Sequence, residues 1–271
     1  MQLTTNVYVE TRFLGANVGY VTTEDGVVMI DTPQRPIDAV TWLKEIEAKG
    51  LIRYLVNLEP HDDHCAGNFL ITAPAVAHEK TREAMLAVDI NQFIKTIAVI
   101  DPDGLSLIDK SRFNVPSITF SECLMLYLGR HSFHLIHLPG HTAGQIAVFV
   151  PEEKVVFTGD NVTYRIRGFL HEADPFAWLE SLKRIGELEV DYIVPGHGEV
   201  CDKSYLKEQA RYVQDCLDTV KKAIDQGWTK AESIARVALP SYYPLDGGSE
   251  SVAPQLLQIS VSRLYDWLSR R

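Results

Sequence analysis

Apolar and polar residues alternate along this chain in short blocks that predict strands and helices in turn. Runs rich in β-branched residues and bounded by turn residues predict strands over 6–10, 16–22, 27–31, 53–58, 75–78, 123–128, 132–138, 145–150, 155–158 and 192–194. Apolar residues at helical spacing, with Pro and Gly at the boundaries, predict helices over 36–50, 62–71, 79–96, 175–187, 203–226, 230–237 and 252–270. Residues 99–117 have weak periodicity and are expected to be irregular.

Strands and helices alternate twice along the chain, and antiparallel hairpins are mixed among them. Asp25-Gly26, for example, predicts a tight turn between two early strands. The pattern predicts an α/β fold, a four-layer αββα sandwich of two mixed sheets with helices outside. No linker rich in Gly, Ser or Pro is recognisable. We therefore expect one domain over 1–271, in which about 203–271 form a helical C-terminal extension that packs on the core or, alternatively, supports a homodimer.

Charge and composition narrow the class of protein. The formal charge of −10 disfavours a nucleic-acid partner, which needs a basic face. No apolar run is long enough to cross a bilayer, and the first residues lack the basic start and apolar core of an export signal. The four cysteines are scattered without a CxxC pair, as expected of reduced thiols. These features predict a cytoplasmic protein with no membrane partner.

Short polar segments at the ends of predicted strands carry the chemistry. Four of them directly follow apolar runs, and they read Glu59-Pro60-His61-Asp62-Asp63-His64, Pro139-Gly140-His141-Thr142, Gly159-Asp160 and Pro195-Gly196-His197-Gly198. A fifth, the Asp25-Gly26 turn, leads into the strand that ends at Asp31. A sheet would deliver the four loops to one edge, where imidazoles and carboxylates can converge on metal. A glycine precedes three of the ligand candidates and lets the backbone approach a crowded centre.

The first segment concentrates ligand-type side chains within a few residues. In an extended segment Glu59, His61 and Asp63 project to one side, and the turn into a helix brings His64 around. By itself, an aspartate after glycine predicts only a turn residue, and a histidine after Pro-Gly predicts only an exposed turn. Taken together they predict a metal site. The remaining histidines are predicted to be structural, and they are His78, His131, His134, His137 and His171.

The order of these motifs resembles the metallo-β-lactamase fold superfamily, from the start of the chain to about Cys201. The usual first motif there is His-x-His-x-Asp-His, whereas this chain has a glutamate at the first position. The resemblance implies two divalent metal ions and assigns their ligands. The first ion would be held by Glu59, His61 and His141, the second by Asp63, His64 and His197, with Asp160 bridging. Zinc is expected first, with iron or manganese as alternatives because a carboxylate is a harder ligand than imidazole.

An aspartate rather than a cysteine at position 160 looks more like glyoxalase II and the lactonases than the β-lactamases. The resemblance thus implies a hydrolase in which a hydroxide bridging the metals attacks the carbonyl carbon of a small ester, thioester, lactone or β-lactam. Asp63 and Asp160 would be its catalytic residues. The alternative is an iron-dependent oxidoreductase on the same fold, like the persulfide dioxygenases or di-iron proteins.

Loop residues supply the candidates for contact with a small-molecule substrate. An arginine near the metals could bind an anionic group, and aromatic residues could form an apolar wall. Solvated surface and core packing explain the same residues equally well. The candidates are Tyr164, Arg165, Arg167, Phe169, Tyr242 and Tyr243.

Overall fold

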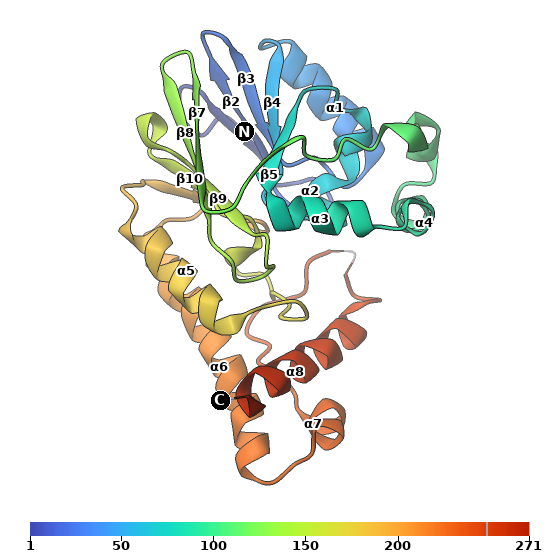
Figure 1. Cartoon of the computed structure of the whole chain (residues 1–271), viewed down its shortest axis with the longest axis vertical. Helices are drawn as coiled ribbons and strands as arrows, with labels where there is room; N and C mark the ends of the chain where they lie inside the picture. The colour runs from blue at the N-terminus through green and yellow to red at the C-terminus, as the bar shows by residue number, and fades with distance from the viewer. Residues whose placement is uncertain (248, 271) are drawn as a thin grey trace.

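Two β-sheets packed face to face form the centre of the structure, a computed structural model that describes residues 1–247 and 249–270 (Figure 1). The first sheet has its strands in chain order: β1 (Val7–Glu10), β2 (Val18–Thr23), β3 (Gly26–Ile30), β4 (Ile52–Val56), β5 (Ala75–His78) and β6 (Ile118–Phe120). The second sheet has the order β11 (Tyr192–Val194), β10 (Val155–Phe157), β9 (Ile146–Val150), β8 (His131–His137) and β7 (Cys123–Leu128).

Strand direction decides where the loops emerge. In the first sheet β3, β4, β5 and β6 run parallel to one another. In the second sheet β9 is antiparallel to both β8 and β10, and β11 is parallel to β10. Strands β8, β10 and β11 therefore point the same way and end at the same edge. The polar segments that follow β8, β10 and β11 are brought together by this topology.

The space between the sheets is filled by apolar residues that alternate along the strands. Those from the first sheet, such as Val28, Ile30 and Val56, pack against Phe133, Val148 and Phe157 of the second. Outside the first sheet, Trp42 of α1 packs on its far face. Outside the second, α5 and α6 pack in the same way (Figure 1). The result is the predicted αββα arrangement, which is confirmed.

The helices are α1 (Pro36–Glu47), α2 (Asp62–Cys65), α3 (Glu79–Ala87), α4 (Ile90–Ile100), α5 (Pro175–Glu187), α6 (Leu206–Asp225), α7 (Lys230–Arg236) and α8 (Ala253–Ser269). Helices α1, α5, α6, α7 and α8 begin and end close to the predicted positions, whereas the helix predicted over 62–71 is α-helical only as far as Cys65 and continues as a 3₁₀ helix. Short 3₁₀ helices cover Ala66–Leu70, Asp103–Leu107, Lys110–Arg112, Pro151–Glu153, Gly159–Asn161 and Lys203–Tyr205. In the part of the chain that the structure describes, no helix is both long and apolar enough to traverse a bilayer.

Helices α6, α7 and α8 occupy the range predicted for the C-terminal extension, and its last residue, Arg271, lies outside the described residues. Helix α8 packs on α6 and α7. Its buried side chains Val261 and Leu264 join the cluster that also contains Trp178 of α5. Some of the apolar residues whose helical spacing predicts this last helix thus pack within the chain.

Two local predictions were wrong. The helix expected over 79–96 is divided into α3 and α4, because Asp89 accepts hydrogen bonds from the backbone N–H groups of Asn91 and Gln92 and so caps a new helix. The segment 99–117, expected to be irregular, begins inside α4 and contains two 3₁₀ helices. It leads into β6, a strand of three residues that is too short to give a periodic signal.

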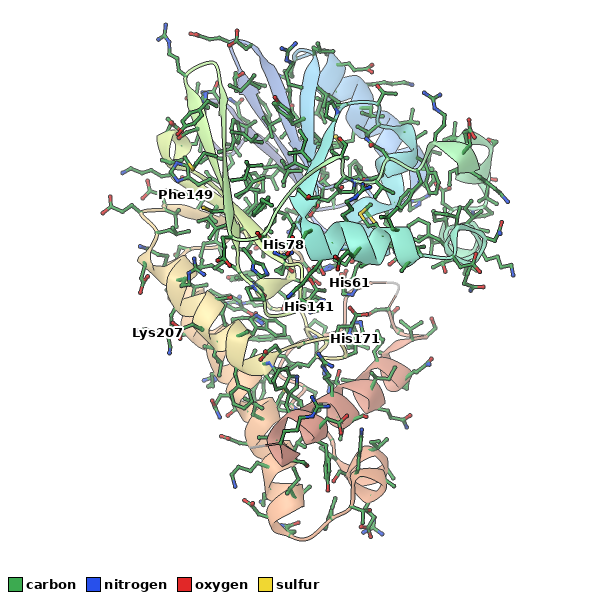
Figure 2. All side chains as sticks on the ribbon, viewed as in Figure 1. His61, His78, His141, Phe149, His171 and Lys207 are labelled. Atoms are coloured by element: carbon green, nitrogen blue, oxygen red, sulfur yellow. The ribbon has the colours of Figure 1, made fainter. Side chains whose placement is uncertain are left out.

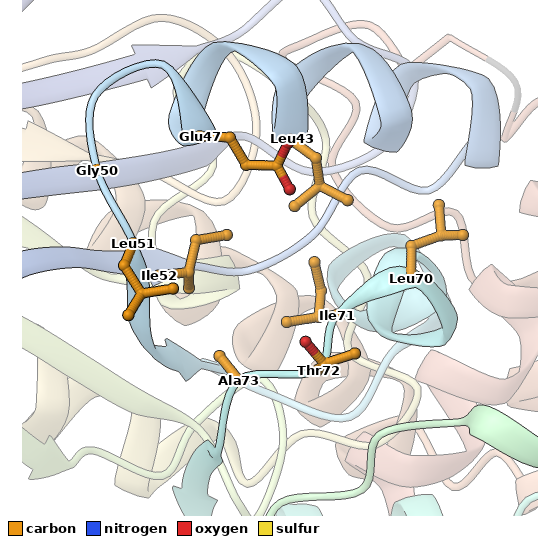
Figure 3. A pocket seen from close by; sticks show the side chains of 9 residues that line it. All are labelled: Leu43, Glu47, Gly50, Leu51, Ile52, Leu70, Ile71, Thr72 and Ala73. Atoms are coloured by element: carbon orange, nitrogen blue, oxygen red, sulfur yellow. The ribbon is translucent and has the colours of Figure 1, made fainter.

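A hollow of about 540 Å³ lies between the end of α1 and the segment leading to β5 (Figure 3). Its lining consists of Leu43, Glu47, Gly50, Leu51, Ile52, Leu70, Ile71, Thr72 and Ala73. Among these described residues only Glu47 is ionisable. The hollow therefore offers little chemistry, and it shares no residue with the predicted metal site.

Gly19 tests the contact between the sheets. A Cβ at this position of β2 would lie 2.4 Å from Cε1 of Phe157 in β10, and that ring is only 2 % exposed. Because the ring has no space to move into, Gly19→Ala should lower the free energy of unfolding by about 1–3 kcal/mol. Urea denaturation followed by circular dichroism measures the change.

Gly186 provides the matched control. A Cβ there would lie 3.6 Å from Cδ1 of Leu206, an ordinary contact, and the residue is helical. Gly186→Ala should therefore raise stability by ~0.5 kcal/mol, the gain expected when alanine replaces a helical glycine. Equal unfolding midpoints for wild type and Gly19→Ala would contradict the packing described for the two sheets.

Candidate metal centre

The predicted ligands converge at one edge of the sandwich, in the loops that follow β4, β8, β10 and β11. The loop after β4 turns into α2 at Asp62, which redirects the chain just before Asp63 and His64. Figure 2 shows His61 and His141 close together between the sheets and the C-terminal helices. Segments far apart in the sequence thus meet in one place.

The first group of donors is Glu59, His61 and His141, whose ligand atoms all lie within 4.8 Å of one another. Nδ1 of His61 is 2.9 Å from Oε2 of Glu59 and 3.3 Å from Nε2 of His141. Donors bound to one tetrahedral ion at 2.0–2.2 Å lie about 3.3–3.6 Å apart. The third spacing, between Oε2 of Glu59 and Nε2 of His141, is 3.9 Å. The three spacings lie on both sides of this range, so small shifts of the side chains would let one small cation contact all three donors.

The second group is Asp63, His64 and His197, with Oδ2 of Asp63 3.1 Å from Nε2 of His197. Asp160 lies between the two groups. Its Oδ1 is 3.2 Å from Nε2 of His64 and 3.4 Å from Nε2 of His197, whereas its Oδ2 is 3.5 Å from Nε2 of His141. Each oxygen of Asp160 thus faces one group, as the resemblance implies for a bridging ligand.

Glu59 supplies the strongest sign that this set fits metal. Its side chain is fully buried, yet within the described part of the chain neither carboxylate oxygen accepts a hydrogen bond. Oε1 lies 3.3 Å from Nε2 of His64, and Oε2 faces the first group. A buried carboxylate without hydrogen bonds is strongly unfavourable unless positive charge compensates it. Divalent cations of the zinc, iron or manganese type match these nitrogen and oxygen donors.

The carboxylates control the protonation of the imidazoles. Burial lowers the pKa of His64, but the carboxylates of Glu59 and Asp31 outweigh it and raise this pKa well above its ordinary value. Neighbouring carboxylates raise the pKa values of His61 and His197 in the same way. Without metal the carboxylates therefore favour the protonated, cationic form of these imidazoles, which offsets the buried negative charge.

Each imidazole of the second group also donates a hydrogen bond to a carboxylate outside the ligand set. Nδ1 of His64 donates to Oδ2 of Asp31 at 2.7 Å, and Nδ1 of His197 donates to Oδ2 of Asp246 at 2.7 Å. Such hydrogen bonds fix the tautomer and leave Nε2 free for a metal. Asp31 is fully buried at a φ of 53°, and burial raises its pKa to about 6. Its other oxygen accepts a hydrogen bond from the backbone of Leu58, which ties β3 to the ligand loop.

His171 was predicted to be structural, but it lies beside the first group (Figure 2). Its ring stacks on His61 with centroids 5.3 Å apart, and Oε2 of Glu172 is 3.7 Å from Nε2 of His61. The three side chains form a further set of possible donors. Nearby His61 holds the pKa of Glu172 at about 2, and burial lowers the pKa of His171 to about 4. No strand end or glycine marks this pair in the sequence, so its position depends on the loop between β10 and α5.

The other four histidines predicted to be structural do lie in structural contacts. His78 and His137 stack with centroids 3.8 Å apart, and His131 pairs with Glu153. His134 contacts Ser132 on its own strand.

Two glycines permit the close approach of the loops. A Cβ at position 196 would lie 1.9 Å from Oδ1 of Asp160, and a Cβ at position 140 would lie 2.4 Å from Oδ1 of Asn161. Asn161 in turn accepts a hydrogen bond from the backbone of His141. Gly196 and Gly140 are therefore required by space at the metal centre.

A cavity of about 680 Å³ opens on the ligands. Of the predicted substrate residues, Arg167 and Phe169 line it. Arg167 also donates from Nη2 to the carbonyl of Leu239 and from its backbone N–H to that of Pro244. It therefore connects the cavity wall to the C-terminal segment.

The other four predicted substrate residues are placed outside the cavity lining. Tyr164 packs on Tyr205, and the exposed Arg165 lies over the Tyr164 ring. The hydroxyls of Tyr242 and Tyr243 donate to carboxylates on α6. The structure thus directs these four side chains to contacts within the chain.

Comparisons with known proteins agree with this geometry. The family model of the metallo-beta-lactamase superfamily matches residues 11–197. A hydroxyacylglutathione hydrolase of Chelativorans sp. is 27% identical over 149 residues, 54% of this chain and 56% of the relative. A linear primary-alkylsulfatase of Pseudomonas sp. is 25% identical over 145 residues, 49% of this chain and 27% of the relative.

Another hydroxyacylglutathione hydrolase, from Erythrobacter litoralis, is 28% identical over 184 residues, 68% of this chain and 60% of the relative. The chain spans about half the length of the curated relatives it matches. Among solved structures, a metallo-beta-lactamase from Pontibacter korlensis aligns with a TM-score of 0.63 at 21% identity, over 79% of this chain and 98% of that one. That likeness shows the fold. Since the family model covers well over half of the sequence and its metal-binding motifs converge in space, the chain belongs to the metallo-beta-lactamase superfamily.

Proposed function

We propose that the protein is a metal-dependent hydrolase of a small ester, thioester, lactone or β-lactam, and that it holds two divalent ions, zinc foremost. The observation that carries this proposal is the position of Asp160, with one oxygen toward each donor group. The relatives described as hydroxyacylglutathione hydrolases support hydrolysis in general. They match over part of their length, so the substrate class is proposed from the site.

Two bound divalent ions would supply Lewis acidity and a water whose pKa lies near neutrality. The surrounding residues orient that water. Although burial raises it, the imidazoles of His64 and His197 bring the pKa of Asp63 below its usual range. Asp63 lines the cavity and is ionised, so it accepts a hydrogen bond from the attacking water.

The reaction then moves one proton in two transfers, from the water to Asp63 and from Asp63 to the leaving group. Hydroxide adds to the carbonyl carbon, the bond from that carbon to the leaving oxygen, sulfur or nitrogen breaks, and Asp63 returns to the leaving group the proton it took from water. Asp160, held by imidazoles on both sides, keeps its carboxylate fixed during this step.

Glu59 supports the alternative function, an iron-dependent oxidoreductase on the same fold. A carboxylate in place of an imidazole makes the first group harder and favours iron or manganese relative to an all-histidine group. The two functions differ in what they consume, because the oxidoreductase needs dioxygen and the hydrolase needs only water.

His141→Ala tests the hydrolase directly. Protein loaded with Zn, Mn or Fe should hydrolyse at least one member of a panel of lactones, thioesters and β-lactams. Changes to residues behind metal ligands already cost about 10–100-fold, so loss of the ligand itself should exceed about 100-fold in kcat/KM. His134→Ala, on β8, the strand that precedes the loop of His141, lies away from the ligands and should stay near wild-type activity. Full activity in His141→Ala, or dioxygen uptake by an iron form that hydrolyses nothing, would contradict the proposal.

Metal binding should release protons and strengthen as pH rises. In the metal-free protein the neighbouring carboxylates raise the pKa values of His61, His64 and His197 well above the ordinary value, which favours their protonated forms, and a metal must displace those protons. Titration of metal-free protein with Zn²⁺ in weak buffer containing a pH indicator measures the release. Glu59→Gln removes a carboxylate that raises two of these pKa values, so it should release fewer protons. A zinc affinity that is the same at pH 6 and pH 8 would refute this electrostatic description.

A further inference from the structure

A cleft between α4 and the start of α8 leads to the metal centre. Its cavity contains the ligands His61, His141 and Asp160. One wall is formed by residues of α4, namely Gln92, Lys95, Thr96, Val99 and Ile100, and the other by Val252, which directly precedes α8, and Leu256 of α8. Since ligands and walls border the same space, a substrate that reaches the metals also lies against these helices.

The walls expose apolar side chains to solvent. Val99 on α4 is 83% exposed and Val252 beside α8 is 47% exposed. Further partly exposed apolar residues line the same cavity, namely Leu14, Ile100, Ile166, Phe169 and Leu256. Apolar side chains that gather around one concave space, rather than scattering singly, mark a binding surface.

The charged side chains that line the cleft do not favour a substrate with a charged group in this cleft. Apart from the metal ligands, the carboxylates of Asp62 and Asp246 are balanced by the cations of Lys95 and Arg167. Arg167 is already engaged with the Leu239 carbonyl. Among the described residues, the lining therefore has no net charge beyond the metal centre, and its exposed apolar surface is the feature left to recognise a substrate.

We propose that the substrate is an ester of an extended apolar acyl chain, which lies between α4 and α8 while its carbonyl group reaches the metal centre. This inference rests on the proposed hydrolase function. The wall from Gln92 to Val99 is about 10 Å long at the helical rise per residue, so it can accompany a chain of several methylenes.

A series of p-nitrophenyl esters from acetyl to dodecanoyl tests the inference on the zinc-loaded protein. Each methylene buried in the cleft should raise kcat/KM by about two- to fourfold until the wall is covered. Val99→Asp places a charge on the wall at an exposed position, so it should lower the ratio of decanoyl to acetyl kcat/KM by at least tenfold. Leu86→Asp, 60% exposed on α3 and outside the lining, is the matched control and should leave the ratio unchanged.

The outcomes separate the two proposals. If acyl esters of every length are cleaved at one rate, or Val99→Asp leaves the ratio unchanged, the acyl-chain inference is overturned and the hydrolase stands. If no ester, thioester, lactone or β-lactam is cleaved by any metal form, the hydrolase itself fails.

A second inference concerns Asp246, which lies beyond the residues matched by the family model, 11–197. Its carboxylate accepts the hydrogen bond from Nδ1 of His197 at 2.7 Å. The same loop is held by backbone hydrogen bonds from Arg167 to Pro244 and from Ser249 to Asp246. The C-terminal segment thereby reaches back to a ligand on the end of β11.

The geometry assigns Asp246 as a positioning residue for the second metal. It orients the His197 ring so that Nε2 faces Asp63 and Asp160, at 3.1 and 3.4 Å. Asp31 does the same for His64 from within the matched region. The C-terminal segment therefore completes the metal centre as well as covering it.

Asp246→Asn tests this role because asparagine keeps the shape and loses the charge. One of two bound Zn²⁺ ions should dissociate about 10–100-fold more readily, measured by competition with a chromophoric chelator, while the other ion is unaffected. The Co²⁺-loaded variant should show altered d–d absorption, and Asp246→Glu should recover much of the affinity. Asp218→Asn, on the exposed side of α6, is the control.

A merely structural role would give a different result. Unchanged dissociation of both ions would overturn the assignment. Equal weakening of both ions together with a lower melting temperature of the metal-free protein would also overturn it, because it would place the effect in the folding of the loop.

Discussion

The burial of one carboxylate is the constraint on which the metal centre depends. Glu59 is inaccessible to solvent and accepts no hydrogen bond from the described residues, so its charge must be balanced by the groups around it. In the metal-free protein the imidazoles of His61 and His64 balance it by holding protons. In the proposed metal-bound form, the cations would take over that task and displace the protons. The same side chains thus serve folding and metal binding through one electrostatic balance.

The direction of the strands and the small size of glycine in the loops allow the other ligands to gather around Glu59. Strands β8, β10 and β11 end at the same edge, so their loops need little length to meet the segment after β4. Gly196 then lets its loop pass against Asp160, where a Cβ would overlap the carboxylate. Asp31 is fully buried and has a left-handed backbone conformation, and its side chain holds the loop that follows β4. Strained backbone of this kind persists only where surrounding contacts fix it, and here those contacts are with His64 and Leu58.

The sequence alone could predict the sandwich and the convergence of the predicted ligands, because both follow from local patterns. Apolar runs that end in His or Asp mark strand ends, and parallel strands bring such ends together. Asp246 and His171 could not be found in this way. Each depends on a loop whose path is set by contacts between residues far apart in the sequence, such as the hydrogen bond from the backbone N–H of Arg167 to the carbonyl of Pro244. The break between α3 and α4 was missed for a different reason, because a single side chain, Asp89, decides it against a continuous apolar pattern.

The two donor groups are not equivalent, because their imidazoles differ in the hydrogen bonds that they make to residues outside the ligand set. Both imidazoles of the second group donate to a carboxylate at 2.7 Å, whereas Nδ1 of His141 in the first group has no hydrogen-bond partner among the described residues. The first group also carries Glu59 where the superfamily usually has a histidine. If two divalent ions bind as proposed, three ligand carboxylates would leave a net charge of one, compared with two for the usual set, and a bound water would be less acidic. The first group is thus less firmly oriented than the second, and its carboxylate makes it a harder set of ligands. The identity of the metal ion bound by the first group would therefore be the main control over reactivity.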